Sequence, residues 1–439
     1  MSKMESSIQK KFAKYVSLNI IGMIGASCYI LADTYFIANG IGPDGLTALN
    51  LAIAVFSFMQ AIGLMIGIGS GTRFGICAAQ GDTEKGNRTF TAAIKLGLSI
   101  GIALAIVGQL FSKEIAQVVG ADKVTLEMTS VYLKTVLSFA PFFIVNNIVL
   151  VFARNDKNPR IATIGMMAGN FANIILDYIF IYPMHMSMFG AAFATGIAPI
   201  VSLLCLSTHF LQKKNTFKLV KCKVSTKKIK DFCSLGSSSF VNEIATSVSL
   251  LAFNLILLNL SGNIAVAAFG VIANLAIVAV AFFTGIAQGI QPLVSEFYAT
   301  MNKENLRKIL KYSVVLAVSF ATVIYIFIFF YNDVIVNLFN KEDNIMLMEI
   351  AESGLRVYFI AFFIGGINVV MAGYLCSMEK ANQGFLISLL RGVVILVPAA
   401  IILSRIFGVL GVWLAVPVTE LLTFLVTLYF MKKNKATVS

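Results

Sequence analysis

Apolar stretches long enough to cross a membrane recur along the whole chain, separated by short polar segments. A membrane-spanning helix needs about 20 mostly apolar residues, because the hydrocarbon core of a bilayer is roughly 30 Å thick. The hydropathy pattern therefore predicts about twelve spans and an all-α polytopic membrane protein. Their cores fall near 14–38, 46–72, 91–111, 130–152, 161–182, 190–211, 235–259, 264–291, 309–331, 349–374, 383–403 and 408–431.

The composition points to the same class. Hydrophobic residues make up 58% of the 439 residues and charged residues only 13%, with a mean hydropathy of +0.86. A soluble domain carries about 25% charged residues. The six cysteines show no paired spacing and mostly lie inside predicted spans, so we interpret them as small apolar packing residues.

The two halves of the chain repeat one pattern at a separation of about 220 positions. Aligned pairs are Gly42 with Gly262, Ala48 with Ala268, and Gly69 with Gly289. The repeat predicts two pseudo-symmetric six-helix lobes, residues 1–211 and 233–439, joined by the basic linker 212–232. Both lobes begin and end on the same side of the membrane, so they are parallel repeats around a cleft that can open to either face.

Basic residues, which give the chain a net charge of +13, gather on alternate connections. They precede the first span, follow the last, fill the linker 212–232, and recur at 73–88, 154–160 and 303–311, whereas connections such as 39–45 hold almost none. This is the positive-inside pattern, and it predicts that both termini are cytoplasmic. Anionic lipid headgroups explain the basic linker, so membrane lipid is an expected partner and nucleic acid is not.

Carboxylates inside the spans are candidates for function, because each costs roughly 2.5–3.5 kcal/mol near the bilayer centre. Asp33 and Asp177 lie in the outer halves of the first and fifth spans. Asn173 shares a helix face with Asp177, four residues on, and Thr195 in the sixth span fits the same depth. These oxygen ligands suit Na⁺. Alternatively, two neighbouring carboxylates would share a proton, and the sequence leaves both options open.

A second charged set lies in the other half. Glu243, Arg391 and Glu420 have similar depths in the seventh, eleventh and twelfth spans. Arg391 can pair with one carboxylate and leave the other titratable. A purely structural Arg–Glu pair is an equal alternative.

Uncharged polar residues at mid-membrane are candidates for a substrate cavity, although helix–helix hydrogen bonding also explains them. The candidate cavity residues are Tyr29, Tyr35, Asn146, Asn147 and Asn170. The two histidines, His185 and His209, lie near span ends and make no metal site.

These residues resemble those of the multidrug and toxic compound extrusion (MATE) family, and the resemblance covers the whole chain. It rests on Asp33 in the first span, on the glycine-rich second and eighth spans, and on the segment Asn173 to Asp177 followed by Thr195. Gly-Ile-Gly-Ser-Gly at 67–71 and Val-Pro-Val-Thr-Glu at 416–420 look most like the MepA-type branch. The resemblance implies the MATE fold and a cation site made by Asp33, Asn173, Asp177 and Thr195. The proline that many members carry upstream of the aspartate is replaced here by Ser17-Leu18-Asn19.

The expected function is a secondary antiporter of a bacterial plasma membrane that exchanges Na⁺ or H⁺ for amphipathic, mostly cationic drugs. We expect a monomer without an organic cofactor. A lipid-linked oligosaccharide flippase is the alternative, but its cationic cavity is not evident, since only Arg391 is clearly intramembrane. A membrane-embedded enzyme is disfavoured, because neither the two histidines nor any Gly-x-Ser-x-Gly-type motif supplies a nucleophile–base or metal cluster. ATP drive is unsupported, because the sequence has no Gly-x-x-x-x-Gly-Lys phosphate loop.

Overall fold

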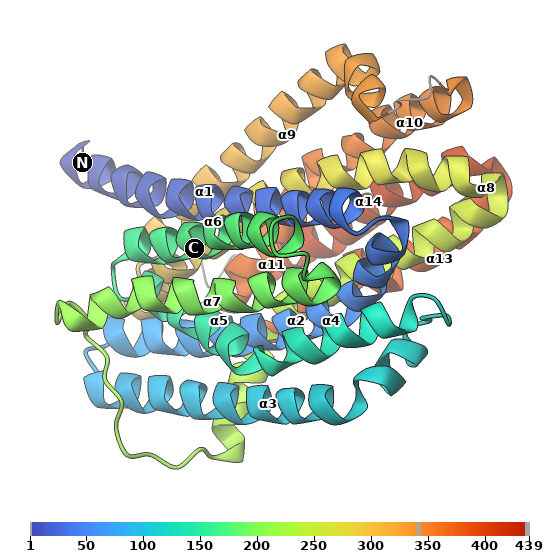
Figure 1. Cartoon of the computed structure of the whole chain (residues 1–439). Helices are drawn as coiled ribbons and strands as arrows, with labels where there is room; N and C mark the ends of the chain where they lie inside the picture. Colours follow the sequence, from blue (N-terminus) through green and yellow to red (C-terminus); the bar gives the residue numbers. More distant parts are fainter. Residues whose placement is uncertain (1, 340–343, 435–439) are drawn as a thin grey trace.

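The structure is a computed structural model that describes residues 2–339 and 344–434. Its amino-terminal lobe consists of seven helices connected by short turns. They are α1 (Ser2–Gly40), α2 (Pro43–Ala79), α3 (Thr83–Val118), α4 (Leu126–Ser138), α5 (Ala140–Asn155), α6 (Pro159–Ile181) and α7 (Ser187–Leu211). Figure 1 shows these helices running side by side along one common direction.

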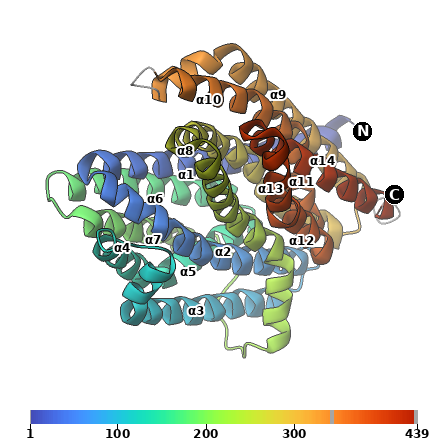
Figure 2. The same ribbon diagram turned by 90° about the vertical axis from the view of Figure 1, so that its right-hand side faces the viewer.

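The carboxy-terminal lobe begins with the longest helix and contains one π-helical turn. Its elements are α8 (Thr226–Ala299), α9 (Lys303–Phe339), α10 (Ile345–Tyr358), the 3₁₀ turn η1 (Phe359–Ala361), α11 (Phe362–Ser377), α12 (Ala381–Leu389), the π-helical turn η2 (Leu390–Val394), α13 (Leu396–Phe407) and α14 (Val409–Lys433). Figure 2 shows the two lobes side by side, with α8 between them.

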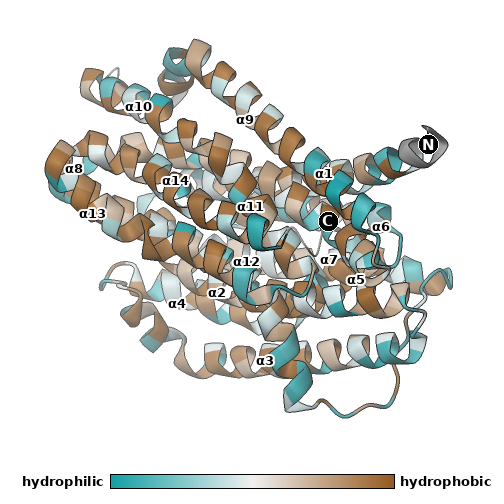
Figure 3. Cartoon of the chain, turned by 180° about the vertical axis from the view of Figure 1, so that it is seen from behind, coloured by the Kyte–Doolittle hydropathy of each residue, from teal (hydrophilic) through white to brown (hydrophobic). Residues whose placement is uncertain are grey.

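The predicted twelve spans are confirmed once two irregular elements are taken into account. Over the described residues, ten helices are long and apolar enough to cross a membrane, and the pair α4 and α5, bent by 49°, adds an eleventh span. Helix α8 has 74 residues, a straight length of about 110 Å, which is several times the thickness of a bilayer. It breaks at Ser261 and Gly262, where Gly262 has a φ of 68° that favours glycine, so it supplies two spans. Figure 3 shows hydrophobic residues covering the flanks of these helices.

The two lobes pack against each other at two helix crossings where a glycine lets the helix backbones approach closely. A Cβ atom on Gly289 of α8 would lie 2.8 Å from the Cα of Val16 in α1. A Cβ on Gly69 of α2 would overlap the carbonyl oxygen of Phe232 in α8 and lie 2.8 Å from its carbonyl carbon. Neither crossing has room for a side chain. Because Gly69 and Gly289 are counterparts in the internal repeat, the seam between the lobes follows the pseudo-symmetry of the chain.

Polar contacts reinforce this seam on the side of the molecule that carries the basic connections, here called the basic side. Arg73 of α2 pairs with Asp231 of α8 at 2.6 Å and also with Glu379. Deeper in, Asn155 donates to Gln291 at 2.9 Å, and the Gln291 amide donates to Thr72 at 3.2 Å. The lobes are therefore joined by charged and amide contacts at this end.

Arg154 corrects one expectation from the sequence. The charge pattern placed it in the basic connection after the fourth span, but its side chain is buried, with 4% exposed. Its Nη1 atom donates to Asn19 of α1 at 2.5 Å and to Gln288 of α8 at 2.8 Å. Arg154 thus bridges the two lobes through neutral amides, and sequence alone gave no sign of these partners.

The segment after α7 lies against the amino-terminal lobe. Thr216 donates its backbone N–H to Asp156 at 3.0 Å, and His209 contacts the same carboxylate at 2.8 Å. Phe217 is fully buried in a group of rings with centroids 4.5–5.5 Å from its own: Phe90, Phe210, Phe74 and Phe152. Of the predicted linker 212–232, the part from Thr226 onward belongs to α8.

Candidate functional site

The amino-terminal lobe buries two carboxyl groups that face each other. Asp33 projects from α1 and Asp177 from α6, and their side chains lie within hydrogen-bonding distance of each other. Asp33 is 7% exposed and Asp177 is fully buried. The two helices come this close because small residues of α1 face α6: a Cβ on Gly25 would lie 3.3 Å from the Asn170 amide nitrogen. The structure therefore brings the two predicted acidic residues together.

Asn173 and Thr195 complete this group. Asn173 lies one helical turn before Asp177 and is fully buried. With its amide oriented to satisfy both neighbours, its nitrogen donates to Asp177 Oδ2 at 3.1 Å, and its oxygen accepts from the Thr195 hydroxyl and backbone N–H, both at 3.3 Å. Helices α1, α6 and α7 thus bring one amide, one hydroxyl and two carboxyl groups into a single cluster.

The cluster contains acceptor atoms that nothing in the described chain satisfies. The Oδ1 atoms of both Asp33 and Asp177 are buried without a hydrogen-bond partner. None of the ion pairs formed by the described residues involves either side chain. Buried carboxylates are normally paired or bound to a cation, so this arrangement fits an exchangeable Na⁺ ion or proton.

Tyr132 belongs to this cluster although the sequence analysis did not include it. It projects from α4, its side chain is buried, and its hydroxyl lies within hydrogen-bonding distance of Thr195. Nothing in the sequence distinguishes it from the other tyrosines, because its proximity depends on how α4 packs against α7.

The candidate cavity residues divide into two groups. Tyr29 is half-buried. It lies close enough to Asp33, Asp177 and Glu243 to interact electrostatically with all three carboxylates. Asn146 and Asn170 each have a buried amide atom without a partner. By contrast, Asn147 is engaged by Gln60 at 2.9 Å. Tyr35 is 63% exposed and packs its ring against Phe36, so it stands apart from the cluster.

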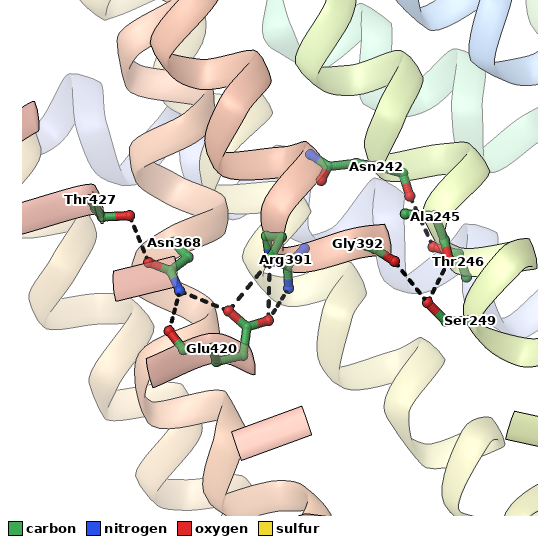
Figure 4. A network of polar contacts seen from close by, with 9 residues as sticks. All are labelled: Asn242, Ala245, Thr246, Ser249, Asn368, Arg391, Gly392, Glu420 and Thr427. Atoms are coloured by element: carbon green, nitrogen blue, oxygen red, sulfur yellow. Dashed lines mark hydrogen bonds and ion pairs between the residues drawn. The ribbon is translucent and has the colours of Figure 1, made fainter. Parts of the chain in front are cut away.

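The carboxy-terminal lobe holds a buried ion pair between Arg391 and Glu420 (Figure 4). Arg391 lies on the π-helical turn η2 and donates through Nη2 and Nε to Glu420 Oε1 at 2.7 and 3.1 Å. Asn368 donates to Glu420 Oε2 at 2.8 Å and accepts from the Thr427 hydroxyl at 2.9 Å. Both carboxylate oxygens of Glu420 therefore have partners inside the lobe.

Glu243 is not part of this network. It lies half-buried on α8, near Tyr29 of the other lobe, and neither the ion pairs nor the side-chain hydrogen bonds of the described residues include it. Of the two carboxylates predicted as partners of Arg391, the structure pairs Glu420 with it and leaves Glu243 out of the ion pair.

Two parallel six-span lobes with buried, partly unpaired charges between their helices define a multi-pass transporter of the two-lobed class. The sequence profile of the MatE family matches residues 19–179 and 239–402, about three quarters of the chain. The chain belongs to the MatE family.

Individual relatives agree with this assignment. The multidrug export protein MepA of Staphylococcus aureus (strain MRSA252) is 27% identical over 424 residues, covering 95% of this chain and 93% of that protein. The crystal structure of MATE in complex with MaL6 superposes with a TM-score of 0.92 at 20% identity, covering 98% of this chain and 97% of the other. An outward-facing MATE transporter of the MOP superfamily gives a TM-score of 0.91 at 21% identity, covering 98% and 96%. The predicted MATE fold is confirmed, and the similarity to MepA extends over nearly the whole length.

Proposed function

We propose that this protein is a cation-coupled antiporter that exports amphipathic, mostly cationic drugs from a bacterial cytoplasm by alternating access. The observation that carries the proposal is the Asp33–Asp177 cluster, which buries two carboxyl groups without a basic partner. The printed name of the similar MepA proteins, multidrug export protein, supports the choice of substrate.

The cluster supplies the coupling step. Asp33 and Asp177 hold the incoming Na⁺ or H⁺, and Asn173 and Thr195 complete its oxygen shell. The membrane potential contributes about 2.3 kcal/mol per charge per 100 mV. That energy drives export only if the cation and the drug favour different states of the transporter. Because Asp33 lies on α1 and Asp177 on α6, a bound cation favours the state in which these two helices are close together.

In this proposal the drug binds between the lobes. Glu243 on α8 lies close enough to Tyr29 on α1 to interact with it electrostatically, so its carboxylate attracts the positive charge of the drug. Tyr29, Asn146 and Asn170 offer an aromatic ring and unpartnered amide atoms for the remainder of the molecule. Asn147 is tied to Gln60 and helps to pack α5 against α2, while the exposed Tyr35 lies at the edge of this region.

The basic connections and both termini face the cytoplasm in this proposal, in a protein that works as a monomer in the plasma membrane. The seam of Arg73, Arg154, Asn155 and Gln291 then closes the cytoplasmic side. With this orientation the seam shuts the transporter toward the cytoplasm, and drug leaves and the cation enters from outside.

A lipid-linked oligosaccharide flippase fits the residues less well. Such a protein needs free cationic groups in its cavity for a pyrophosphate. In the described chain Arg391 is occupied by Glu420 and Arg154 by two amides, so neither is open to a ligand of that kind.

Ethidium efflux by whole cells tests the proposal. We expect Asp33→Asn and Asp177→Asn to reduce efflux to the level of cells without the transporter, because both remove a coupling carboxylate. The exposed Asp44→Asn at the start of α2 serves as the matched control and should transport normally. Wild-type efflux by both Asp33→Asn and Asp177→Asn at equal expression would refute the proposal. Inverted vesicles energised separately with a Na⁺ or a pH gradient distinguish the two ions.

A further inference from the structure

The Arg391–Glu420 pair has the composition of a cation site that is already filled. Glu420 is 4% exposed, and its carboxylate is surrounded by an amide from Asn368 and by the guanidinium of Arg391. The Asn368 amide in turn accepts from the Thr427 hydroxyl. Carboxylate, amide and hydroxyl are the same groups that surround the unpaired carboxyls of the amino-terminal lobe.

Further unused oxygen atoms lie on the same helix. The hydroxyls of Thr419 and Thr423 in α14 are buried without a hydrogen-bond partner. Thr423 and Thr427 lie three and seven residues after Glu420, which places them on the face of α14 that carries the carboxylate. Arg391 binds only the carboxylate oxygens of Glu420, so the Thr423 hydroxyl on this face of α14 remains available to a bound cation.

The location of the pair repeats that of the amino-terminal cluster. Asp177 and Thr195 lie on the fifth and sixth spans, whereas Arg391 and Glu420 lie on the eleventh and twelfth, which are their counterparts in the repeat. Both lobes thus place a charged side chain on the fifth span of the repeat, Asp177 in one and Arg391 in the other. They differ in that one lobe leaves the cation position open, and the other fills it with a side chain.

Arg391 lies on an irregular stretch of helix backbone, the π-helical turn η2. The π-helical turn η2 closes with Ile395 N–H donating to the Leu390 carbonyl at 3.0 Å. Such turns insert a residue into a helix and are frequent at functional sites. The neighbouring carbonyl of Gly392 accepts from Ser249 of α8 at 3.3 Å, as Figure 4 shows, so the turn is fixed to a second helix.

We propose that Arg391 is a resident cation in a second cation site, centred on Glu420, and that it limits the transporter to the one exchangeable cation site of the amino-terminal lobe. This rests on the proposed function, since it assumes that the Asp33–Asp177 cluster exchanges a cation. Removal of Arg391 leaves an uncompensated buried carboxylate, which takes up a Na⁺ ion or a proton in its place.

The test counts cations bound by purified protein. Na⁺ is measured by equilibrium binding of ²²Na⁺ at alkaline pH, and protonated buried carboxyl groups by their infrared carbonyl band during a pH titration. We expect Arg391→Met to hold one more cation equivalent than the wild type, as Na⁺ or as a proton. Arg391→Lys keeps the resident charge and should match the wild type. An Arg391→Met protein that folds and binds no additional equivalent overturns the proposal.

The double variant Arg391→Met/Glu420→Gln keeps the test decisive if Arg391→Met alone does not fold. It removes both charges together, so it should bind and transport with the wild-type number of cations per drug; a lower number would overturn the proposal. Failure of the proposed function has a different signature. In that case the wild type itself would lose no cation equivalent when Asp33 and Asp177 are replaced by asparagine.

Discussion

The two lobes share a scaffold and differ in their charges. Both contribute a glycine to the seam at equivalent positions, Gly69 and Gly289, and both place a charged side chain on the fifth span of the repeat, Asp177 and Arg391. In the amino-terminal lobe Asp33 and Asp177 lie beside each other without a basic partner, and the Asn173 amide is the polar neighbour of Asp177. In the carboxy-terminal lobe Glu420 has an arginine. The comparison teaches that duplication supplied the symmetric frame, and that the lobes then diverged in how their buried carboxyl groups are paired.

The largest expected effect on stability comes from removing one member of the Arg391–Glu420 ion pair of the carboxy-terminal lobe. Arg391→Met should destabilise the protein by about 3–5 kcal/mol at alkaline pH without Na⁺, where no cation replaces the arginine beside the buried Glu420 carboxylate. The double variant Arg391→Met/Glu420→Gln should lie close to the wild type. Thermal unfolding in detergent measures both. Equal destabilisation of the single and double variants would mean that the charges do not act as a pair.

The docked segment after α7 belongs to the amino-terminal lobe alone, and its anchor is Phe217. Phe217→Ala should cost about 3–5 kcal/mol, the usual range for a buried phenylalanine, and should open the segment to proteases. The neighbouring Leu219 is 67% exposed, so Leu219→Ala should change stability by less than about 0.5 kcal/mol. Limited proteolysis and thermal unfolding of the two variants provide the comparison, and similar behaviour would argue against a docked segment.

The symmetric part of the comparison can be tested at the seam. Gly69→Ala and Gly289→Ala each place a methyl group against the backbone of the other lobe, which should cost about 1–3 kcal/mol through overpacking. Both variants should also loosen the basic side to a similar extent, as seen by hydrogen exchange in α2 and α8. Gly270→Ala, where a Cβ meets nothing within 4 Å, is the control. A strong effect at only one glycine would show that the seam is not symmetric.

The smallest expected effects compare one hydroxyl in each lobe. Thr195→Val removes an oxygen from the proposed exchangeable site and should weaken apparent cation affinity roughly tenfold, equivalent to about 1.4 kcal/mol. Thr427→Val removes a hydrogen bond to Asn368 and should cost about 1 kcal/mol of stability without changing cation affinity. Cation titrations of drug efflux measure the first effect and thermal unfolding the second. A shift in cation affinity caused by Thr427→Val would contradict the distinction between the lobes.

The scaffold could be predicted from the sequence because hydropathy and repetition are local signals. The twelve spans follow from apolar runs, and the break in α8 at Gly262 coincides with the counterpart of Gly42, which ends the turn after α1. The four-residue spacing of Asn173 and Asp177 placed them on one face, and they do contact each other.

The partners of most buried polar groups could not be predicted, since they depend on packing between distant helices. The sequence offered Arg391 two carboxylates at similar depths, and only the structure pairs it with Glu420. Arg154 looked like a loop residue because it belongs to a basic run, yet α1 and α8 enclose it. The positions of Tyr132 and Phe217 could not be predicted from the sequence, because they depend on contacts with residues far away in the chain, such as Thr195 for Tyr132 and Phe90 for Phe217.

The most direct test of the account compares the two lobes in one assay of cation-driven drug efflux from proteoliposomes. Asp177→Asn should abolish efflux driven by the cation gradient, because it removes the exchangeable site. Arg391→Met/Glu420→Gln should retain efflux with an unchanged number of cations per drug. The opposite result, in which Asp177→Asn transports normally and the double variant loses its coupling, would contradict the assignment of cation exchange to the amino-terminal lobe.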